Sequence, residues 1–419
     1  MEDRVYFVID MKSFFASVEC AERGLDSMVT NLVVADASRT DKTICLAVSP
    51  AMKKLGVKNR CRLFQIPKNI NYIIAKPRMK KYIEYNAKIY SIYLKYFDKK
   101  DLFVYSIDEC IIDVTDYLKL YNTRAKPFAL KLIKEIKEKI HIPATCGIGT
   151  NMYLAKIALG ITAKKAKDGI GWLTQEKFIK ELSHHRPLSD FWGISRGIEN
   201  HLARLGIYDM AGISSFDENI LYEEFGVNAE LLIDHSKGIE PVRIEDVKNY
   251  KNKSKSISSA QILPKDYNYE DALISLKEMV LSGCYNLSEQ NLVATTIGIG
   301  VVYAGYKEGI SVSSKMLVAT NLNSFISKEV ERLYVENVDK TKMIRRLAFG
   351  FSGLLPMENE QYNLFTDLKQ VEKEKKLQDS IVKIRDRFGK NSLLKAMDLG
   401  ENATAILRNK QIGGHNSDE

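Results

Sequence analysis

Tyr105-Ser106-Ile107-Asp108-Glu109-Cys110-Ile111-Ile112-Asp113 is the stretch of this chain that decides its fold. Its centre is an adjacent acidic pair, Asp108-Glu109, flanked by the apolar, strand-prone runs 102–107 and 110–114. The pattern predicts two short strands that turn at the acidic pair. Carboxylates at a strand turn, unlike those on a solvated helix face, are well placed to hold a divalent cation.

A second acidic position fits the same design. The continuous apolar run Val5-Tyr6-Phe7-Val8-Ile9 is typical of a strand buried on both faces, and it ends in Asp10. Three carboxylates at strand ends are the arrangement that a magnesium-dependent phosphoryl-transfer centre needs. An acidic pair in a turn is more often simple solvated turn chemistry, so the spacing alone leaves both interpretations open.

The residues around these acids carry a family resemblance. Asp10-Met11-Lys12-Ser13-Phe14-Phe15-Ala16-Ser17-Val18-Glu19, followed much later by Tyr-Ser-Ile-Asp-Glu at 105–109, resembles the signature pair of the Y-family, translesion DNA polymerases. The resemblance extends from residue 1 to about residue 355 and points to the UmuC-like bacterial branch. It implies an α/β right-hand fold with palm, fingers, helical thumb and little finger. It also implies template-directed, error-prone addition of deoxynucleotides to a primer 3′-OH in DNA repair and the SOS response.

The composition fits such a protein. A chain of 419 residues is too long for one core, and a hydrophobic content of 45% is that of a folded globular protein. The net charge of +9 favours a polyanionic partner. No apolar run approaches the ~20 residues that span a bilayer, and the six cysteines are scattered without a C-x-x-C spacing. We therefore expect a cytoplasmic protein, nucleoid-associated when active, with reduced thiols and no membrane partner.

The resemblance implies the catalytic residues. Asp10, Asp108 and Glu109 would hold two Mg²⁺ ions, and the backbone carbonyl of Met11 would ligate one of them. Phe15 occupies the steric-gate position, where a bulky side chain lies under the sugar of the incoming nucleotide. Its neighbour Phe14 is a second nucleotide-site candidate, although core packing also accounts for it.

The segment 47–57 matches the family's fingers motif with two departures. Where the family has a tyrosine and an arginine that touch the triphosphate, this chain has Pro50 and Lys53. Lys53 keeps the positive charge but loses bidentate geometry, and Pro50 supplies neither hydroxyl nor backbone N–H. Ser49 and Lys53 remain the candidate contacts of this motif. Other basic residues could compensate, or could form only a solvated surface: Lys54, Lys58, Arg60 and Arg62.

Further along, 78–97 and 128–140 have helical periodicity, and 144–148 is strand-like. The glycine pair Gly147-x-Gly149 alone is a weak phosphate-loop signal, because the third glycine of a dinucleotide fingerprint is missing. In 163–170 both Lys164 and Lys167 fit the position of the family's triphosphate lysine, and spacing favours Lys164. A basic turn that merely faces solvent is the alternative.

Residues 171–236 are predicted to be helical. Trp192-Gly193-Ile194-Ser195-Arg196-Gly197-Ile198 has the spacing of a helix-hairpin-helix turn, in which Gly193, Ser195 and Gly197 would contact a DNA backbone without reading sequence. An ordinary corner between two helices is the alternative.

The C-terminal part begins with a polar run at 248–256. Its Lys255 is suited to lie against the phosphates of a DNA duplex. Strands are expected near 257–263, 293–303 and 343–352, and helices near 270–286 and 322–335, in a plan of roughly four strands. Arg345 and Arg346 at the start of a strand are candidate DNA contacts, unless they only keep an edge strand soluble. Residues 367–399 are expected to be helical, and those beyond about 409 to be disordered.

Gln361, Leu364 and Phe365 form a Gln-x-x-Leu-Phe peptide that resembles the motif with which bacterial polymerases dock on the sliding clamp. Leu364 and Phe365 would fill an apolar pocket and Gln361 would fix the register. A packed helix start is the alternative. UmuC-like relatives also work with a recombinase filament and a UmuD-like subunit, although no residue here assigns either partner.

Together these observations predict six regions and the substrates primer-template DNA and deoxynucleoside triphosphates. The regions are palm 1–23 and 81–170, fingers 24–80, thumb 171–236, linker 237–256, little finger 257–355 and clamp-binding tail 356–419. The alternative function is a DNA-binding accessory factor with little polymerase activity, which the departures at Pro50 and Lys53 keep open. A template-free nucleotidyl transferase is disfavoured, since it has no use for a thumb and little finger.

Overall fold

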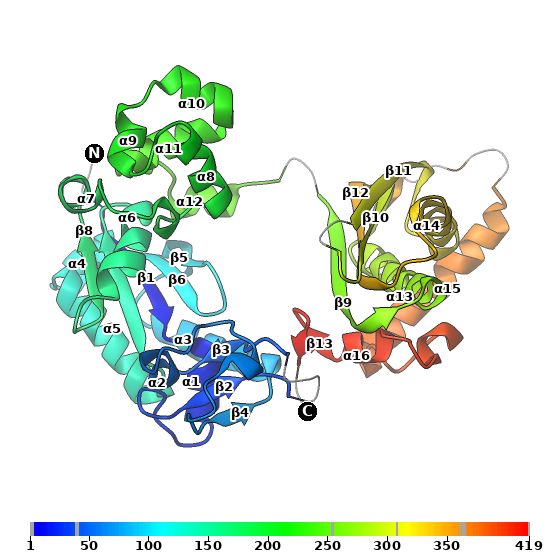
Figure 1. Ribbon diagram of the computed structural model, residues 1–419, viewed down its shortest axis with the longest axis horizontal. Helices are drawn as coiled ribbons and strands as arrows, with labels where there is room; N and C mark the ends of the chain where they lie inside the picture. The colour runs from blue at the N-terminus through cyan, green and yellow to red at the C-terminus, as the bar shows by residue number, and fades with distance from the viewer. Residues whose placement is uncertain are drawn as a thin grey trace. The chain divides into compact units, whose positions relative to one another are not determined.

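The computed structural model describes residues 4–37, 42–252, 255–306, 309–359, 362 and 366–417. The chain forms two compact units that are divided between Tyr250 and Lys251 (Figure 1). The first unit carries the N-terminal acidic position and the acidic pair, and the second carries the C-terminal sheet.

A five-stranded mixed sheet is the centre of the first unit. Its strand order is β5-β6-β1-β7-β8, with β7 and β8 parallel and the other neighbours antiparallel. The strands are β1 (Tyr6–Met11), β5 (Leu102–Val104), β6 (Glu109–Asp113), β7 (Ala144–Gly149) and β8 (Ile170–Leu173). The strand pair around the acidic residues, the N-terminal strand and the strand at 144–148 are thus where the sequence predicts them.

Helices cover both faces of this sheet, which explains the continuous apolar run of β1. Phe7 and Ile9 face one layer and Tyr6 and Val8 face the other. The first layer contains α1 (Phe14–Ala21), α3 (Met79–Tyr93) and α5 (Ala125–Ile140). The second contains α6 (Met152–Ile157), the π-helical segment η3 (Ala158–Ala163) and α12 (Ile244–Asn249).

Glycines let the second layer lie directly on the strands. A Cβ at Gly147 would stand 2.0 Å from the carbonyl oxygen of Ala155, and one at Gly149 would stand 2.1 Å from the amide nitrogen of Ala155. Gly171 on β8 approaches η3 in the same way, 2.4 Å from the carbonyl oxygen of Ala158. The Gly147-x-Gly149 pair is therefore explained by close packing of a helix backbone on the sheet.

The predicted fingers segment is more regular than its composition suggests. It forms a small sheet of order β3-β2-β4, where β2 pairs with β3 antiparallel and with β4 parallel. Its elements are β2 (Leu32–Val34), β3 (Ala47–Val48), α2 (Pro50–Lys54), η1 (Leu63–Gln65) and β4 (Ile73–Ala75). Strands of two or three residues are too short to show an alternating pattern, which is why the sequence predicts an irregular segment.

The remaining elements of the first unit are mostly helical. A separate core around Tyr153, Phe178 and Phe191 holds the helices that follow β8, here called the helical subdomain. They are α7 (Gln175–Leu182), η4 (Leu188–Asp190), α8 (Arg196–Arg204), α9 (Met210–Ser215), α10 (Glu218–Phe225) and α11 (Asn228–Ser236). Two further short elements flank β5 and β6, namely η2 (Lys99–Asp101) and α4 (Thr115–Leu120).

Part of the predicted linker is packed structure. Ile244 of α12 is buried with Tyr6 and Ile111 of the sheet, and Val247 packs beside it. Lys248 donates to the backbone carbonyl of Lys100 at 2.9 Å. The chain is thus fixed to the first unit as far as Asn249, immediately before the division between the units.

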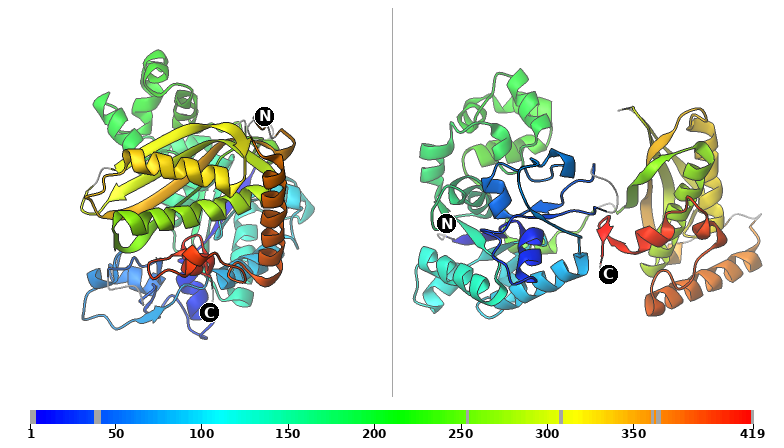
Figure 2. Two further views of the ribbon diagram at one scale, coloured as in Figure 1. Left: turned by 90° about the vertical axis from the view of Figure 1, so that its right-hand side faces the viewer. Right: turned by 60° about the horizontal axis from the view of Figure 1, so that its bottom comes forward.

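The second unit is a four-stranded antiparallel sheet of order β11-β10-β12-β9 with two helices on one face (Figure 2). Its elements are β9 (Ile257–Tyr267), α13 (Tyr269–Glu289), β10 (Leu292–Tyr303), β11 (Gly309–Thr320), α14 (Asn323–Asn337) and β12 (Ile344–Pro356). The sequence does not locate β11, since serines dilute its alternating apolar positions. Because β12 lies between β10 and β9, the edge-strand explanation of Arg345 and Arg346 is wrong.

The C-terminal segment packs on α13 of the second unit. Ile381 and Val382 form a small core with Leu281 and Tyr285, and Gln378 donates to the hydroxyl of Ser288 at 2.7 Å. The elements are η5 (Met357–Asn359), α15 (Leu368–Phe388), η6 (Ala396–Leu399), α16 (Ala405–Asn409), β13 (Gln411–Ile412) and β14 (His415–Asn416). The expectation of disorder beyond residue 409 is wrong, because β13 and β14 pair as a hairpin.

Among the described residues, no helix combines the length and the apolar character that a bilayer span requires.

Candidate active site

The register of the first sheet brings the backbones of the three predicted acidic residues together. Asp10 on β1 stands directly opposite Glu109 on β6, and directly opposed residues have Cβ atoms about 4.5–5.5 Å apart. The amide of Met11 donates to the carbonyl oxygen of Asp108 at 3.0 Å, which fixes the third acid beside the first. Asp10, Asp108 and Glu109 are called the acidic edge below.

The charges of the acidic edge act on one another. Burial raises the pKa of Asp10 to about 7, and the negative charges of Asp108 and Glu109 add to this effect. The positive charges of Lys156 and Lys164 oppose it. Such a raised pKa means that negative charge at this edge is incompletely compensated, and a bound cation would relieve it.

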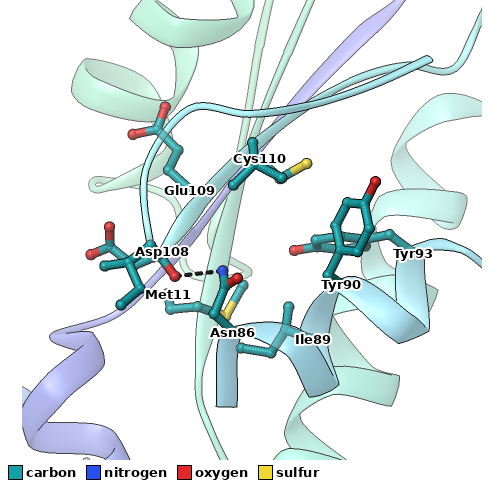
Figure 3. Close-up of a pocket in the computed structure, with 10 residues that line it drawn as sticks. Met11, Asn86, Ile89, Tyr90, Tyr93, Asp108, Glu109 and Cys110 are labelled. Carbon is teal, nitrogen blue, oxygen red and sulfur yellow. Dashed lines mark hydrogen bonds between the residues drawn. The ribbon is translucent and has the colours of Figure 1, made fainter. Parts of the chain in front are cut away.

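Glu109 is already held by a cation of the protein. Both of its carboxylate oxygens accept from the ammonium group of Lys156 on α6. Burial raises the pKa of Glu109, and the hydrogen bond from Lys156 opposes that rise. The side chain of Glu109 therefore points away from that of Asp108 (Figure 3). Within the described ranges, no three acidic, histidine or cysteine side chains gather as a ready-made metal site.

The donor set fits a hard divalent cation. Carboxylate oxygens from Asp10 and Asp108 are the ligands that Mg²⁺ prefers, and Glu109 can join them once Lys156 releases it. The register and the raised pKa of Asp10 thus support a metal site, and the ion pair of Glu109 means that its assembly requires one side chain to move.

A small crevice lies between the acidic turn and α3 (Figure 3). Side chains around it hold the turn in place. Asn86 donates from its side-chain amide to the carbonyl oxygen of Ile107 at 2.7 Å. The hydroxyl of Ser106 donates to a carboxylate oxygen of Asp108 at 2.7 Å. These contacts restrict the turn, so that Asp108 is positioned before any ligand binds.

Phe15 lies on an aromatic support. Its ring stacks on that of Tyr82 with the centroids 4.5 Å apart. The hydroxyl of Tyr82 donates to Glu19 at 3.0 Å, and Arg78 makes two hydrogen bonds of 2.9 Å to the same carboxylate. Phe14, in contrast, is buried in the core. Only Phe15 of the pair is partly exposed, as a side chain under a sugar must be.

The two residues of the fingers motif have different surroundings. Ser49 is fully buried, and its hydroxyl donates to the carbonyl oxygen of Thr30 and accepts from Leu32, so it caps α2 and ties it to β2. Partial burial lowers the pKa of Lys53, while the charges of Asp10 and Asp108 oppose that fall. Lys53 and Lys164 therefore both lie within the electrostatic reach of the acidic edge.

The predicted DNA-binding turn of the helical subdomain is exposed. Gly193 has a φ of +91°, which other residues rarely adopt. The hydroxyl of Ser195 accepts from the amide of Ile198 at 3.3 Å and caps α8. Gly193, Ser195 and Gly197 are all open to solvent, so a backbone phosphate could approach the start of the helix.

In the second unit, Arg345 and Arg346 are consecutive but both exposed, because the register shifts at this point of β12. Arg345 also lies 3.4 Å from Asp266. Lys255 is exposed. Gln361, Leu364 and Phe365 lie outside the described residues, so the clamp motif stays a prediction.

Sequence reasoning missed two residues of the site. Lys156 follows the predicted strand at 144–148, and nothing in its spacing from the acidic pair indicates that it binds Glu109. Tyr82 lies in the segment 78–97, whose periodicity indicates a helix but not the packing of α3 against α1 on which the stacking with Phe15 depends.

The arrangement defines a class of fold. The first unit has a mixed sheet with an acidic edge, a small sheet and a helical subdomain, and a separate α/β unit follows it, which is a right-hand fold. A solved Y-family DNA polymerase chimera of Dbh and Dpo4 has the same fold, with a TM-score of 0.65 and 24% identity. The match covers 84% of this chain and 99% of that one.

The sequence comparisons identify the family. Residues 9–160 match the impB/mucB/samB family, and residues 254–364 match the C-terminal domain of that family. The chain is 31% identical to DNA polymerase IV 2 of Bacillus subtilis (strain 168), over 99% of both chains. It is 29% identical to the putative UV-damage repair protein UvrX of the same organism, over 98% of this chain and 97% of the relative.

The chain belongs to the impB/mucB/samB family of Y-family DNA polymerases. It is a DNA-directed DNA polymerase.

Proposed function

We propose that this polymerase carries out error-prone translesion synthesis, with two divalent cations held by the acidic edge. The observation that carries the metal site is the register of β1 and β6, which sets Asp10 opposite Glu109 and ties Asp108 to Met11. The similarity to a UV-damage repair protein supports the role in damage tolerance.

The residues of the site divide the work of nucleotidyl transfer. Two bound Mg²⁺ ions would lower the pKa of the primer 3′-OH and neutralise charge on the leaving pyrophosphate. Asp10, Asp108 and Glu109, with the Met11 carbonyl, would bind and space them. Lys53 and Lys164 would attract the triphosphate, since both already interact electrostatically with Asp10. Asn86 keeps the acidic turn in place through Ile107.

The other contacts belong to the same proposal. Gly193, Ser195 and Gly197 would bind the DNA backbone at the exposed start of α8, and Lys255, Arg345 and Arg346 would neutralise phosphates. Gln361, Leu364 and Phe365 would dock on a sliding clamp. The cytoplasm is the proposed location, and a damage-induced role is the proposed setting.

Primer extension on intact and abasic-site templates tests the function. We expect the wild-type protein with Mg²⁺ to extend primers on both templates, and we expect EDTA to stop extension. Asp108→Ala serves as the catalytically inactive control. Extension that halts at the lesion while continuing on the intact template would contradict translesion synthesis and leave the polymerase activity standing.

Replacing Tyr82 should weaken the exclusion of ribonucleotides. Tyr82→Leu keeps an apolar side chain but removes the flat ring under Phe15, and stacked aromatic pairs contribute about 0.5–1.5 kcal/mol. We therefore expect discrimination against ribonucleotides to fall by roughly two- to tenfold, measured as the ratio of kcat/KM for matched deoxy- and ribonucleotides. Tyr82→Phe keeps the ring and loses only the hydrogen bond to Glu19. It should retain the wild-type ratio, and equal losses in both variants would contradict the stacking role.

A further inference from the structure

A chain of side-chain contacts leads from the acidic edge to the exposed turn of the helical subdomain. Its first member is Lys156, whose ammonium group binds both carboxylate oxygens of Glu109. The same ammonium group lies over the ring of Tyr105, 4.4 Å from its centroid. Lys156 is thus shared between a proposed metal ligand and an aromatic ring of the acidic turn.

Tyr105 continues this chain of contacts to the helical subdomain. Its hydroxyl accepts a hydrogen bond from the indole nitrogen of Trp192 at 3.1 Å. The two rings also meet edge to face, with centroids 6.0 Å apart and planes at 78°. Trp192 immediately precedes Gly193, the first glycine of the exposed turn. Three contacts in series therefore join Glu109 to that turn, and all of them lie within the first unit.

Trp192 has a second aromatic neighbour, which belongs to a buried cluster. Its ring lies roughly parallel to that of His235, 6.2 Å away, and His235 stacks on Tyr153 at 3.8 Å. His235 is also paired with Glu240 at 3.0 Å, and both side chains are buried. A change at Tyr105 therefore alters one of the aromatic contacts of Trp192, while His235 is held by its own buried partners.

We infer that Lys156 is a positioning residue that couples cation binding at Glu109 to the DNA-binding turn through Tyr105 and Trp192. This inference rests on the proposed metal site. A divalent cation and the ammonium group repel each other and compete for the same carboxylate, so metal binding displaces Lys156 from Glu109. The contact with Tyr105 then changes, and with it the hydrogen bond from Trp192. Coupling of this kind is reciprocal, so DNA bound at the turn changes the metal affinity by the same factor.

Trp192 provides a direct readout of this coupling. The chain has two tryptophans, so Trp172→Phe leaves Trp192 as the only indole. We would titrate this variant with Ca²⁺ in the absence of DNA, and record indole emission and the thermal midpoint in parallel. The expected result is a saturable change of Trp192 emission whose midpoint coincides with that of the metal-dependent rise in Tm.

Two further substitutions in the Trp172→Phe background separate the steps. Tyr105→Phe keeps the ring under Lys156 but removes the hydroxyl that Trp192 binds, so the emission change should vanish while the rise in Tm persists. Lys156→Met removes the competing ammonium group. It should raise the metal affinity by about fivefold or more, which is the size of typical coupling between sites, and abolish the emission change.

Lys164→Met is the control for charge alone. Lys164 also acts electrostatically on Asp10 but is not a member of this chain of contacts, so its variant should keep the emission change. A rise in Tm without any emission change from Trp192 would overturn the coupling and leave the metal site standing. If Ca²⁺ causes no rise in Tm and no emission change, both the coupling and the proposed metal site are overturned. An emission change that survives in Tyr105→Phe would also overturn the coupling.

Discussion

Asp10→Asn is expected to abolish primer extension and, at the same time, to make the metal-free protein more stable above pH 7. The loss of activity follows from the proposed role of Asp10 as a ligand of the catalytic cations, and should exceed about a hundredfold. The gain in stability follows from the raised pKa of Asp10, which is caused by burial and by the charges of Asp108 and Glu109.

The pH range of the stability gain follows from the sign of this pKa shift. The pKa of Asp10 rises from 3.8 to about 7 on folding. Between these values the folded protein therefore holds a proton that the unfolded chain has lost, and wild-type stability falls as pH rises through this interval. A shift of about 3 units corresponds to an upper limit of about 4 kcal/mol. Because Asp10 is partly exposed and screened by water, we expect about 1–2 kcal/mol at pH 8.

Thermal unfolding in EDTA at pH 4.5 and pH 8 measures this effect. Each kcal/mol should raise Tm by about 2–4 °C in a unit of this size. The Tm of the variant should exceed that of wild type at pH 8 and should be close to it at pH 4.5. Added Mg²⁺ should stabilise wild type more than the variant. Asp113→Asn is the matched control on β6, because Asp113 is paired with Arg4 at 2.7 Å and its loss should not stabilise the protein. A lower Tm for Asp10→Asn at pH 8 would contradict the electrostatic account.

The sequence predicts the sheet of the first unit well because its signals are local. The runs before Asp10 and around Asp108-Glu109 are apolar, bounded and rich in strand formers, so both strands and the acids at their ends follow from the pattern. That Asp10 and Glu109 stand opposite each other depends on pairing between segments about a hundred residues apart. Local periodicity carries no information about that register.

Contacts that depend on tertiary packing could not be predicted in this way. Lys156 reaches Glu109 only because Gly147 and Gly149 let α6 lie on β7, a fact about two backbones rather than about residue spacing. The packing of α15 on α13 could not be predicted from local periodicity either. The polar helix of the C-terminal segment contributes only a few apolar side chains, such as Ile381 and Val382, and its docking relies on specific hydrogen bonds from Gln378.

Gly147→Ala is expected to destabilise the first unit strongly. The added methyl group would lie 2.0 Å from the carbonyl oxygen of Ala155 and 2.3 Å from the amide nitrogen of Leu159. Both are backbone atoms of the helical layer, which cannot rotate away as the end of a side chain can. Overpacking a core usually costs about 1–3 kcal/mol. Because α6 and η3 must shift as a body, we expect at least about 3 kcal/mol, or a fall in Tm of about 6 °C or more.

Gly160→Ala is the matched control, because Gly160 lies in η3 itself and a Cβ there has no neighbour within 4 Å. It should leave Tm unchanged or raise it slightly, since alanine favours a helical conformation. The site of the Gly147 substitution also predicts an effect on metal binding. If α6 moves away from β7 in the Gly147 variant, Lys156 moves with it, and Glu109 loses its partner in the metal-free protein. The surviving folded fraction should then bind Mg²⁺ more tightly than wild type. Equal Tm values for the two alanine variants would show that the helical layer is not packed on the strand as closely as the glycines allow.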